Sequence, residues 1–470
     1  MNLELNGTNV IDESERGGKA SSLFWPWCGA NVSLLALSYG AFFLGFGISF
    51  WQATLAALLG TVLSFLLVGF SSLAGKKSNA PTMVLARATF GVKGAIIPGL
   101  LSYLVFVGWE IVLMSLATLA TGTVFIRLGN LDQNTAMAIG FAIAIALTVS
   151  AGVLGFAVIM RIQRILTIVT LVMTVVYISL TFNKVDWSVI TSIPSGNAQG
   201  FIGAIIFGAT GIGLGWVNAA ADYSRYLPRM TSSKAVVGWT VFGASVVPII
   251  LVTYGAALSG SSKDLSDAIA GDPIGALTTI LPSWYLIIFA LVAILGLVGG
   301  AILNLYSSGL ALIAIGLPVK RHIAASIDAI LMLIGVIYFV WIADSFFYPF
   351  QGFLITLGVP IAVWSAIFVT DVLLRKSYNE IDLYSHGGRY GGWNVHSVVI
   401  MAIGTFVGWG FVTNTFASWL SWQGYFLHLI GGKDGSWAYT NLGVFFALLI
   451  GFIGYFLLAR EKIARQELAS

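Results

Sequence analysis

Charged residues are scarce in this chain. Only 9% of its 470 residues are charged, against roughly a quarter in an average soluble protein. Apolar residues make up 58% of the chain, and they gather in repeated stretches of about 20 residues, the length that crosses a ~30 Å hydrocarbon layer. We therefore predict an all-α polytopic membrane protein, because stretches of this length are too long for the strands of a membrane barrel.

Cysteine and catalytic motifs are also lacking. Cys28 is the only cysteine, which excludes an intramolecular disulfide and a cysteine-rich metal site. The chain contains no HExxH, GxSxG, Walker-type loop or Cys-His cluster, and the two histidines of the glycine-rich segment 385–396 are weak evidence for metal binding. We predict no enzyme activity, no cofactor and no metal. The net charge of +4 is not gathered on one soluble face, so a nucleic-acid partner is not expected.

Twelve apolar segments qualify as transmembrane helices. They are centred near residues 36, 63, 108, 146, 173, 213, 247, 300, 332, 360, 406 and 448. The first 23 residues are polar and lack the order of a signal peptide, so we place the N-terminus in the cytoplasm. With this start, 19 of the 23 basic residues fall on the cytoplasmic side, as the positive-inside rule demands, and the exceptions are Arg127, Lys184, Lys263 and Lys433. We expect a multi-pass protein of the cell membrane with both termini inside.

The order of the spans allows an inverted repeat. Five spans occupy 24–182 and five more occupy 200–371. Because five is odd, the second set begins on the opposite side of the membrane from the first. The rest of the chain is predicted to form a cytoplasmic N-terminal tail (1–23), a cytoplasmic connector (372–394), helices 11 and 12 (395–459) and a cytoplasmic C-terminal tail (460–470).

The first span of each set is interrupted by small residues. These interruptions are SYGAFFLGFG at 38–47 and GATGIGLGW at 208–216. Glycine interruptions at matching places in two halves indicate the discontinuous helices that form the midplane site of a transporter. Unwound backbone is costly in lipid and persists only where it lines a protein cavity. The alternative is that these glycines allow close helix packing.

Two tryptophans and an amide indicate the chemistry of such a cavity. Trp109 follows a glycine deep in the third span, Trp216 follows Gly215 in the sixth, and Asn304 lies in the eighth. Two indoles can stack on a planar ring, and an amide offers a donor and an acceptor to its edge. The alternative for a lone Trp is the aromatic belt at the membrane interface. We predict a binding site for a small flat heterocycle.

Several segments resemble those of the nucleobase cation symporter-1 family, in its purine and cytosine permease branch. They are ARATFGVKGAIIP (86–98), VGWE (107–110), GWVNAAADYSRYLP (215–228) and NLYSSGL (304–310). The resemblance implies the leucine-transporter fold, with a 5+5 inverted repeat, broken first and sixth spans and two peripheral helices. It also implies that Trp109 and Trp216 stack on the ligand, that Asn304 bonds its edge, and that a polar residue near Ser38 contributes.

Two positions depart from the family pattern. Permeases of this branch commonly have Asn or Gln one turn after the third-span Trp, where this chain has Leu113. Sodium-coupled relatives carry hydroxyl residues where this chain has Val298 and Gly299. A hard cation needs oxygen ligands, and neither residue supplies one from its side chain. We therefore favour protons over sodium as the coupling ion.

Two carboxylates are candidates for proton coupling. Glu110 lies within the third span, where an ionised side chain is expensive and protonation is favoured; the alternative is a structural hydrogen bond. Asp222 lies near the end of the sixth span close to Arg225, which favours a structural ion pair over proton transfer. The predicted function is import of a small planar heterocycle by proton symport. A sodium-coupled importer of a hydantoin, allantoin, pyridoxine or thiamine-precursor type compound, and a channel, remain the alternatives.

Overall fold

The computed structural model describes residues 7–129, 131–152, 156–317, 319, 321–414 and 418–468. Within these ranges the regular secondary structure is entirely helical. Nine helices are long and apolar enough to cross a membrane, and a bent pair makes a tenth span. Two shorter apolar helices, Ser326–Ile342 and Val395–Gly410, bring the described spans to the predicted twelve.

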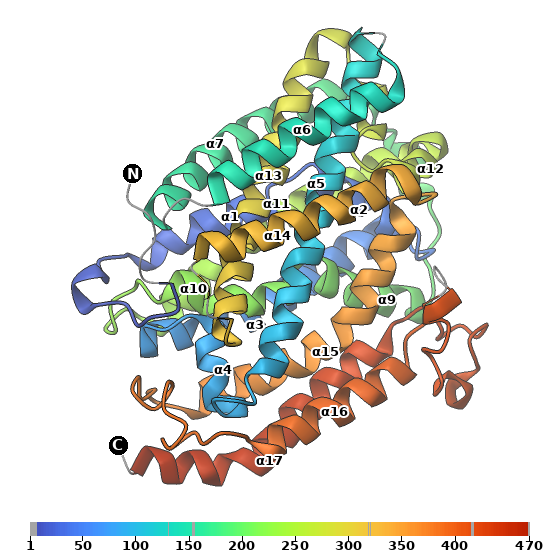
Figure 1. The fold of residues 1–470 in the computed structure, drawn as a ribbon. Helices are drawn as coiled ribbons and strands as arrows, with labels where there is room; N and C mark the ends of the chain where they lie inside the picture. The colour runs from blue at the N-terminus through green and yellow to red at the C-terminus, as the bar shows by residue number, and fades with distance from the viewer. Residues whose placement is uncertain are drawn as a thin grey trace.

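The spans follow the predicted order along the chain (Figure 1). The first five are α1 (Phe24–Asn31) with α2 (Leu35–Leu44), α3 (Phe50–Ser78), α5 (Ile96–Gly129), α6 (Gln133–Gly152) and α7 (Phe156–Thr181). The next five are α9 to α10 (Ala198–Gly208 to Ala220–Ser224), α11 (Ser233–Ser261), α13 (Leu286–Ala314), α14 (Arg321–Ile337) and α15 (Phe347–Leu374). The last two are α16 (Val395–Gly410) and α17 (Leu442–Leu468). Shorter helices α4 (Thr82–Phe90), α8 (Trp187–Ser192) and α12 (Lys263–Gly271) lie between spans.

Corresponding helices of the two halves pack on each other. The second spans, α3 and α11, are in contact, and so are the third spans, α5 and α13. This pairing is the arrangement that an inverted repeat produces. Helices α16 and α17 lie side by side against α15 at one edge of the bundle (Figure 1), which is the peripheral position predicted for them.

The first span bends by 66° between its two halves, earlier than predicted. The break lies at Val32–Leu34, whereas α2 runs unbroken through most of the glycine-containing stretch that we expected to unwind. Two polar side chains hold the break: Asn31 Nδ2 donates to Trp27 O at 2.8 Å, and Ser33 Oγ accepts from Leu35 N at 3.2 Å. Polar side chains therefore bond backbone groups on both sides of the bend, and residues 32–34 contain no glycine.

Gly40, inside the stretch predicted to unwind, serves close packing instead. A Cβ at Gly40 would overlap the backbone nitrogen of Ala256, and a Cβ at Gly255 would overlap the carbonyl oxygen of Leu37. Helices α2 and α11 thus cross backbone to backbone at this point. At Gly40 the packing alternative therefore holds, whereas Gly45 and Gly47 lie beyond the end of α2.

The sixth span changes helical form where its glycines predicted a break. After α9 comes a π-helical turn, η4 (Ala209–Gly213), then a 3-10 segment, η5 (Leu214–Ala219), before α10 resumes. Thr210 Oγ1 donates to Ile206 O at 2.8 Å, and Asn218 Nδ2 donates to Gly215 O at 3.0 Å. Side chains therefore bond carbonyls along the stretch where the regular α-helical pattern is lost.

The described parts of both segments that we predicted as tails are structured and contact the helix bundle or extend one of its helices. Arg16 is buried, and its guanidinium donates to Lys76 O at 2.7 Å and to Glu13 at 2.9 Å. At the other end α17 continues to Leu468, so much of the expected C-terminal tail is the end of this helix. Residues 1–6 and 469–470 lie outside the described part of the chain.

The connector between α15 and α16 is held to the bundle by backbone hydrogen bonds. Val92 N donates to Gly391 O, and Lys93 N donates to Gly392 O, both at 2.8 Å. The two bonds attach the glycine-rich segment of the predicted connector to the turn between α4 and α5.

Candidate functional site

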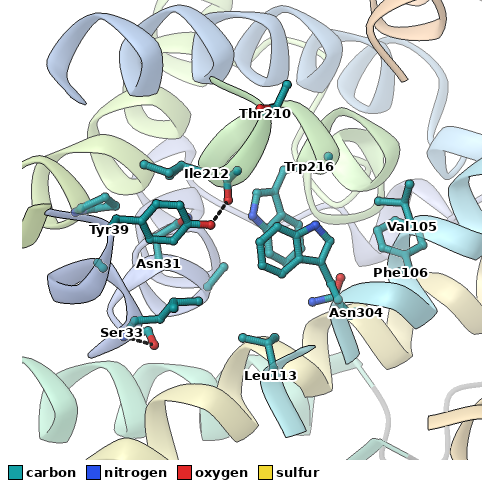
Figure 2. A pocket seen from close by; sticks show the side chains of 17 residues that line it. Asn31, Ser33, Tyr39, Val105, Phe106, Leu113, Thr210, Ile212, Trp216 and Asn304 are labelled. Atoms are coloured by element: carbon teal, nitrogen blue, oxygen red, sulfur yellow. Dashed lines mark hydrogen bonds between the residues drawn. The ribbon is translucent and has the colours of Figure 1, made fainter. Parts of the chain in front are cut away.

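A cavity of about 60 Å³ lies between the two broken spans and the third and eighth spans. Figure 2 shows Tyr39 and Trp216 facing each other across it, with Leu113 and Asn304 nearby. The residues that line it are Ala30, Asn31, Ser33, Leu35, Ala36, Tyr39, Val105, Phe106, Trp109, Leu113, Thr210, Gly211, Ile212, Gly215, Trp216, Pro248 and Asn304. Most of the lining is apolar, and a few polar groups converge on it, as in small-molecule sites generally.

Both predicted tryptophans line this cavity from different spans. Trp109 on α5 makes an edge contact with Phe350, with ring centroids 5.7 Å apart. Trp216 on η5 makes a similar contact with Trp27 at 5.8 Å. These T-shaped contacts hold each indole in a defined orientation at the cavity wall.

Asn304 presents half of its amide to the cavity. Its Nδ2 donates to Gly300 O at 2.9 Å, one turn earlier on α13. This bond uses one N–H and fixes the orientation of the amide. The Oδ1 acceptor and the second N–H are the groups that a ligand edge could bond.

Gly215 and Leu113 also line the cavity, whereas Ser38 does not. A Cβ at Gly215 would lie 3.5 Å from Trp109 Nε1, an ordinary contact distance, so the two residues border the same part of the cavity. Ser38 is fully buried, and its Oγ donates to Pro273 O outside the cavity. The polar residues that the first span does contribute are Asn31 and Ser33.

Tyr39 is the main lining residue that sequence reasoning missed. Its hydroxyl donates to Gly211 O at 2.8 Å, the bond drawn in Figure 2, and joins the second half of the first span to the π-helical turn of the sixth. A carbonyl freed by irregular helix needs a donor, and here another span supplies it. No local pattern around Tyr39 indicates this partner, because the two residues are far apart in sequence.

Glu110 lies beside the cavity and not in it. It is fully buried on α5, and neither of its carboxylate oxygens has a hydrogen-bond partner in the described part of the chain. A buried polar group without a partner is costly in a folded protein. The choice between proton transfer and a structural hydrogen bond for Glu110 therefore stays a prediction.

Asp222 is held by hydrogen bonds that differ from the expected ion pair. Its Oδ1 accepts from Thr82 N and Thr82 Oγ1 at 2.9 and 3.0 Å, and its Oδ2 accepts from Ser307 Oγ at 2.8 Å. Arg225 donates instead to Tyr306 Oη at 3.0 Å and to Gly7 O at 3.0 Å. The carboxylate thus joins α10 to the N-terminal end of α4, where a negative charge is favoured.

Val298 and Gly299, the positions without side-chain oxygens, lie buried on α13 beside an amide. A Cβ at Gly299 would lie 3.5 Å from both Nε2 and Oε1 of Gln163, on α7. Neither amide atom of Gln163 has a hydrogen-bond partner among the described residues. The side chain nearest to Gly299 is therefore a neutral amide and not a hydroxyl.

The chain matches a family of known permeases over most of its length. The family model described as "Permease for cytosine/purines, uracil, thiamine, allantoin" matches residues 10–431. YxlA of Bacillus subtilis (strain 168), whose name places it among the purine-cytosine permeases, is 24% identical over 99% of this chain and 98% of its own. The purine-cytosine permease FCY2 of Saccharomyces cerevisiae is 27% identical over 55% of this chain and 48% of its own.

The same fold occurs in a solved transporter. The structure of Mhp1, a nucleobase-cation-symport-1 family transporter in a closed conformation with bromovinylhydantoin bound, gives a TM-score of 0.72 at 19% identity, covering 99% of this chain and 100% of that one. The inward-facing conformation of Mhp1 gives 0.70 at 20% identity, covering 98% and 95%. The predicted transporter fold is confirmed, and so is the prediction of a permease in place of an enzyme. The chain is a member of the family of permeases for cytosine and purines, uracil, thiamine and allantoin.

Proposed function

We propose that this permease imports a small planar heterocycle through the cell membrane by alternating access, with both termini in the cytoplasm. The observation that carries the proposal is the cavity at the junction of the two irregular spans, which Trp109, Trp216 and Asn304 all line. A flat ring placed between or against the indoles would gain stacking energy, and Asn304 would fix its orientation.

The lining favours a ligand with a short polar edge. Asn304 has one amide N–H bonded to Gly300 O, which leaves its Oδ1 and second N–H for a ligand. Leu113 is apolar, so it offers no second amide to a ligand with a longer hydrogen-bonding edge. A purine or cytosine buried against Leu113 would leave polar groups without partners, which lowers affinity. Nucleobases, hydantoins, allantoin, pyridoxines and thiamine-type pyrimidines all belong in the test panel.

Two aromatic clusters support a gated carrier over a channel. Tyr39, Phe42 and Phe207 lie within ring-contact distance of one another on one side of the cavity. On the other side Trp27 contacts Trp216 and Tyr223. Because rings pack on both sides of the site, a ligand would need a conformational change to enter or leave.

Binding is tested on purified protein with that panel. One compound should raise the unfolding temperature and quench tryptophan fluorescence. For that compound, Trp216→Ala and Asn304→Ala should weaken binding, the former by roughly 5- to 150-fold because a stacked ring contributes ~1–3 kcal/mol. Trp284→Ala, at a position 63% exposed, is the matched control. Unchanged binding in both cavity variants would mean that the site lies elsewhere.

We propose protons as the coupling ion. Buried Glu110 has no hydrogen-bond partner among the described residues, and the place for a sodium ion lacks side-chain oxygens at Val298 and Gly299. The hydrogen bonds of Asp222 support a structural role for that carboxylate. One proton moving down a 100 mV potential releases ~2.3 kcal/mol, enough for roughly fifty-fold accumulation of a neutral substrate.

Coupling is tested by uptake into proteoliposomes with imposed ion gradients. A proton gradient without sodium should drive accumulation, and a protonophore should abolish it. Glu110→Gln should retain binding but lose concentrative uptake. Accumulation that follows a sodium gradient and ignores the protonophore would reject proton coupling, and uptake that only equilibrates the compound would favour a channel.

A further inference from the structure

A second buried carboxylate contacts the helix that carries Glu110. Asp328, on α14, is fully buried, and it accepts hydrogen bonds from Tyr103, two turns before Glu110 on α5, and from Ser308 on α13. We infer that Asp328 and Glu110 form one proton-binding pair in which Asp328 is the anion and Glu110 carries the exchangeable proton. This inference rests on the proposed proton coupling, and it adds a residue and a mechanism to it.

The hydrogen bonds divide the two roles. Tyr103 Oη donates to Asp328 Oδ1 at 2.5 Å, and Ser308 Oγ donates to Asp328 Oδ2 at 2.7 Å. Both Asp328 oxygens therefore accept from hydroxyls, which is the environment of an ionised carboxylate. Glu110 accepts none from the residues that the structure describes. Two neighbouring carboxylates in a dry interior do not both ionise, so the proton belongs to the one without donors.

The elements around the pair bring few other ionisable groups. Tyr103 and Glu110 lie two turns apart on the same face of α5, α13 contributes the Ser308 hydroxyl, and α6 has no ionisable residue between 133 and 152. Arg87 on α4 donates to the carbonyls of Leu383 and Ala314 instead. No described cation bonds to either carboxylate. A bound proton is therefore what reduces the two negative charges of the pair to one.

Ser308 connects the pair to the ligand cavity. It lies one turn after Asn304 on α13, and Glu110 directly follows Trp109 on α5. Ser308 has a single hydroxyl hydrogen, and its Oγ lies 2.7 Å from Asp328 Oδ2 and 3.2 Å from its other acceptor, Leu305 O. If opening of the site admitted water and turned this hydroxyl to Glu110, the interior would no longer be dry, and the glutamate would be stabilised as an anion and release its proton to that water. In the return step Glu110 takes up a proton and Ser308 bonds Asp328 again, so charge and atoms balance over the cycle.

The experiment is an infrared difference titration of the reconstituted full-length protein, which needs no substrate. Wild type should show a carboxylic-acid C=O band that disappears as the pH rises, and Glu110→Gln should lack this band. Asp328→Asn removes the neighbouring negative charge, so the band should disappear at a pH lower by about one unit or more. Asp328→Glu should restore the wild-type midpoint. Tyr103→Phe removes a donor from Asp328, so the pair should hold its proton to higher pH.

The pH at which the band disappears should fall in Asp328→Asn and rise in Tyr103→Phe. Such opposite shifts distinguish a coupled pair from damage to the fold, which would shift both variants alike. The exposed variant Asp267→Asn is the matched control and should leave the band unchanged. An unchanged midpoint in Asp328→Asn, or a band that survives in Glu110→Gln, overturns the inference. So does a band that sodium removes at fixed pH, since the pair would then bind a metal cation.

Uptake of labelled adenine and cytosine, and of any other compound that the panel identifies, separates this inference from the proposed function. Proton-driven uptake with the same pH dependence in wild type and Asp328→Asn would overturn the pair and leave proton symport intact. Wild-type uptake that ignores the proton gradient would instead overturn proton symport, whatever the infrared bands show.

Discussion

The indole N–H of Trp364 donates to Asn218 Oδ1 over 2.9 Å, and Asn218 Nδ2 in turn donates to Gly215 O at 3.0 Å. Trp364 lies on α15, so this chain of two bonds joins the tenth span to the 3-10 segment of the sixth. The backbone beside Trp216 is thereby held by a helix that does not line the cavity. Such supporting contacts set the precision of a binding site.

Trp364→Phe should lower the stability of the protein although an aromatic ring still fills the position. The ring contact with Phe368, at 4.9 Å, can persist, but Asn218 Oδ1 loses its donor. An unsatisfied buried acceptor costs about 1–3 kcal/mol, which should appear as a lower unfolding temperature in detergent. The matched change at the exposed Trp284 should have no such effect. Equal unfolding temperatures for both variants would show that the Trp364 bond contributes nothing.

Gly215→Ala should weaken ligand binding while the protein remains folded. The added Cβ would meet Trp109 Nε1 and Val105 Cγ1 at 3.5 Å, an ordinary contact distance. The methyl group occupies space in a small cavity, and overpacking typically costs ~1–3 kcal/mol once the ligand is bound. Calorimetric titration with the active panel compound measures this loss. Full affinity in the variant would place the ligand away from η5.

Leu113→Gln should shift the preference of the site toward ligands with a longer polar edge. The new amide would enter the cavity near Asn304 and offer one further hydrogen bond, worth about 0.5–1.5 kcal/mol. Adenine and cytosine should gain up to roughly tenfold in affinity relative to the wild-type ligand. Competition binding measures the ratio, with Leu113→Met as the apolar control. If the Met variant changed the ratio equally, shape and not hydrogen bonding would explain the result.

Gly255→Ala should destabilise the crossing of α2 and α11. The new Cβ would overlap the carbonyl oxygen of Leu37, a backbone atom that cannot move aside alone. Separating two packed helices costs ~1–3 kcal/mol or more, so the unfolding temperature should fall. Gly238 lies on the same helix with open space around it, because a Cβ there would meet no described atom within 4 Å, and Gly238→Ala should be neutral. Similar melting of the two variants would argue against the close crossing.

Composition and local pattern were sufficient to predict that the protein is a helical membrane protein and to predict the number and order of its spans. Long apolar stretches must become helices in lipid, because no water satisfies the backbone there, so the twelve spans could be predicted from length and hydropathy. The change of helical form at 208–216 was also predictable, since closely spaced glycines weaken a helix. The motifs around Trp109, Trp216 and Asn304 indicated the family correctly.

Contacts between distant residues were decided only by the tertiary structure. The break at Val32–Leu34 depends on polar groups whose role is visible once the bend exists, and Gly40 is a packing glycine because α11 crosses there. Asp222 bonds Thr82 and not the nearby Arg225, and Asp328 on α14 bonds Tyr103 on α5. Hydropathy constrains each helix along its own length, but the partner of a buried polar group is chosen by how the helices pack, and a single sequence carries no local record of that choice.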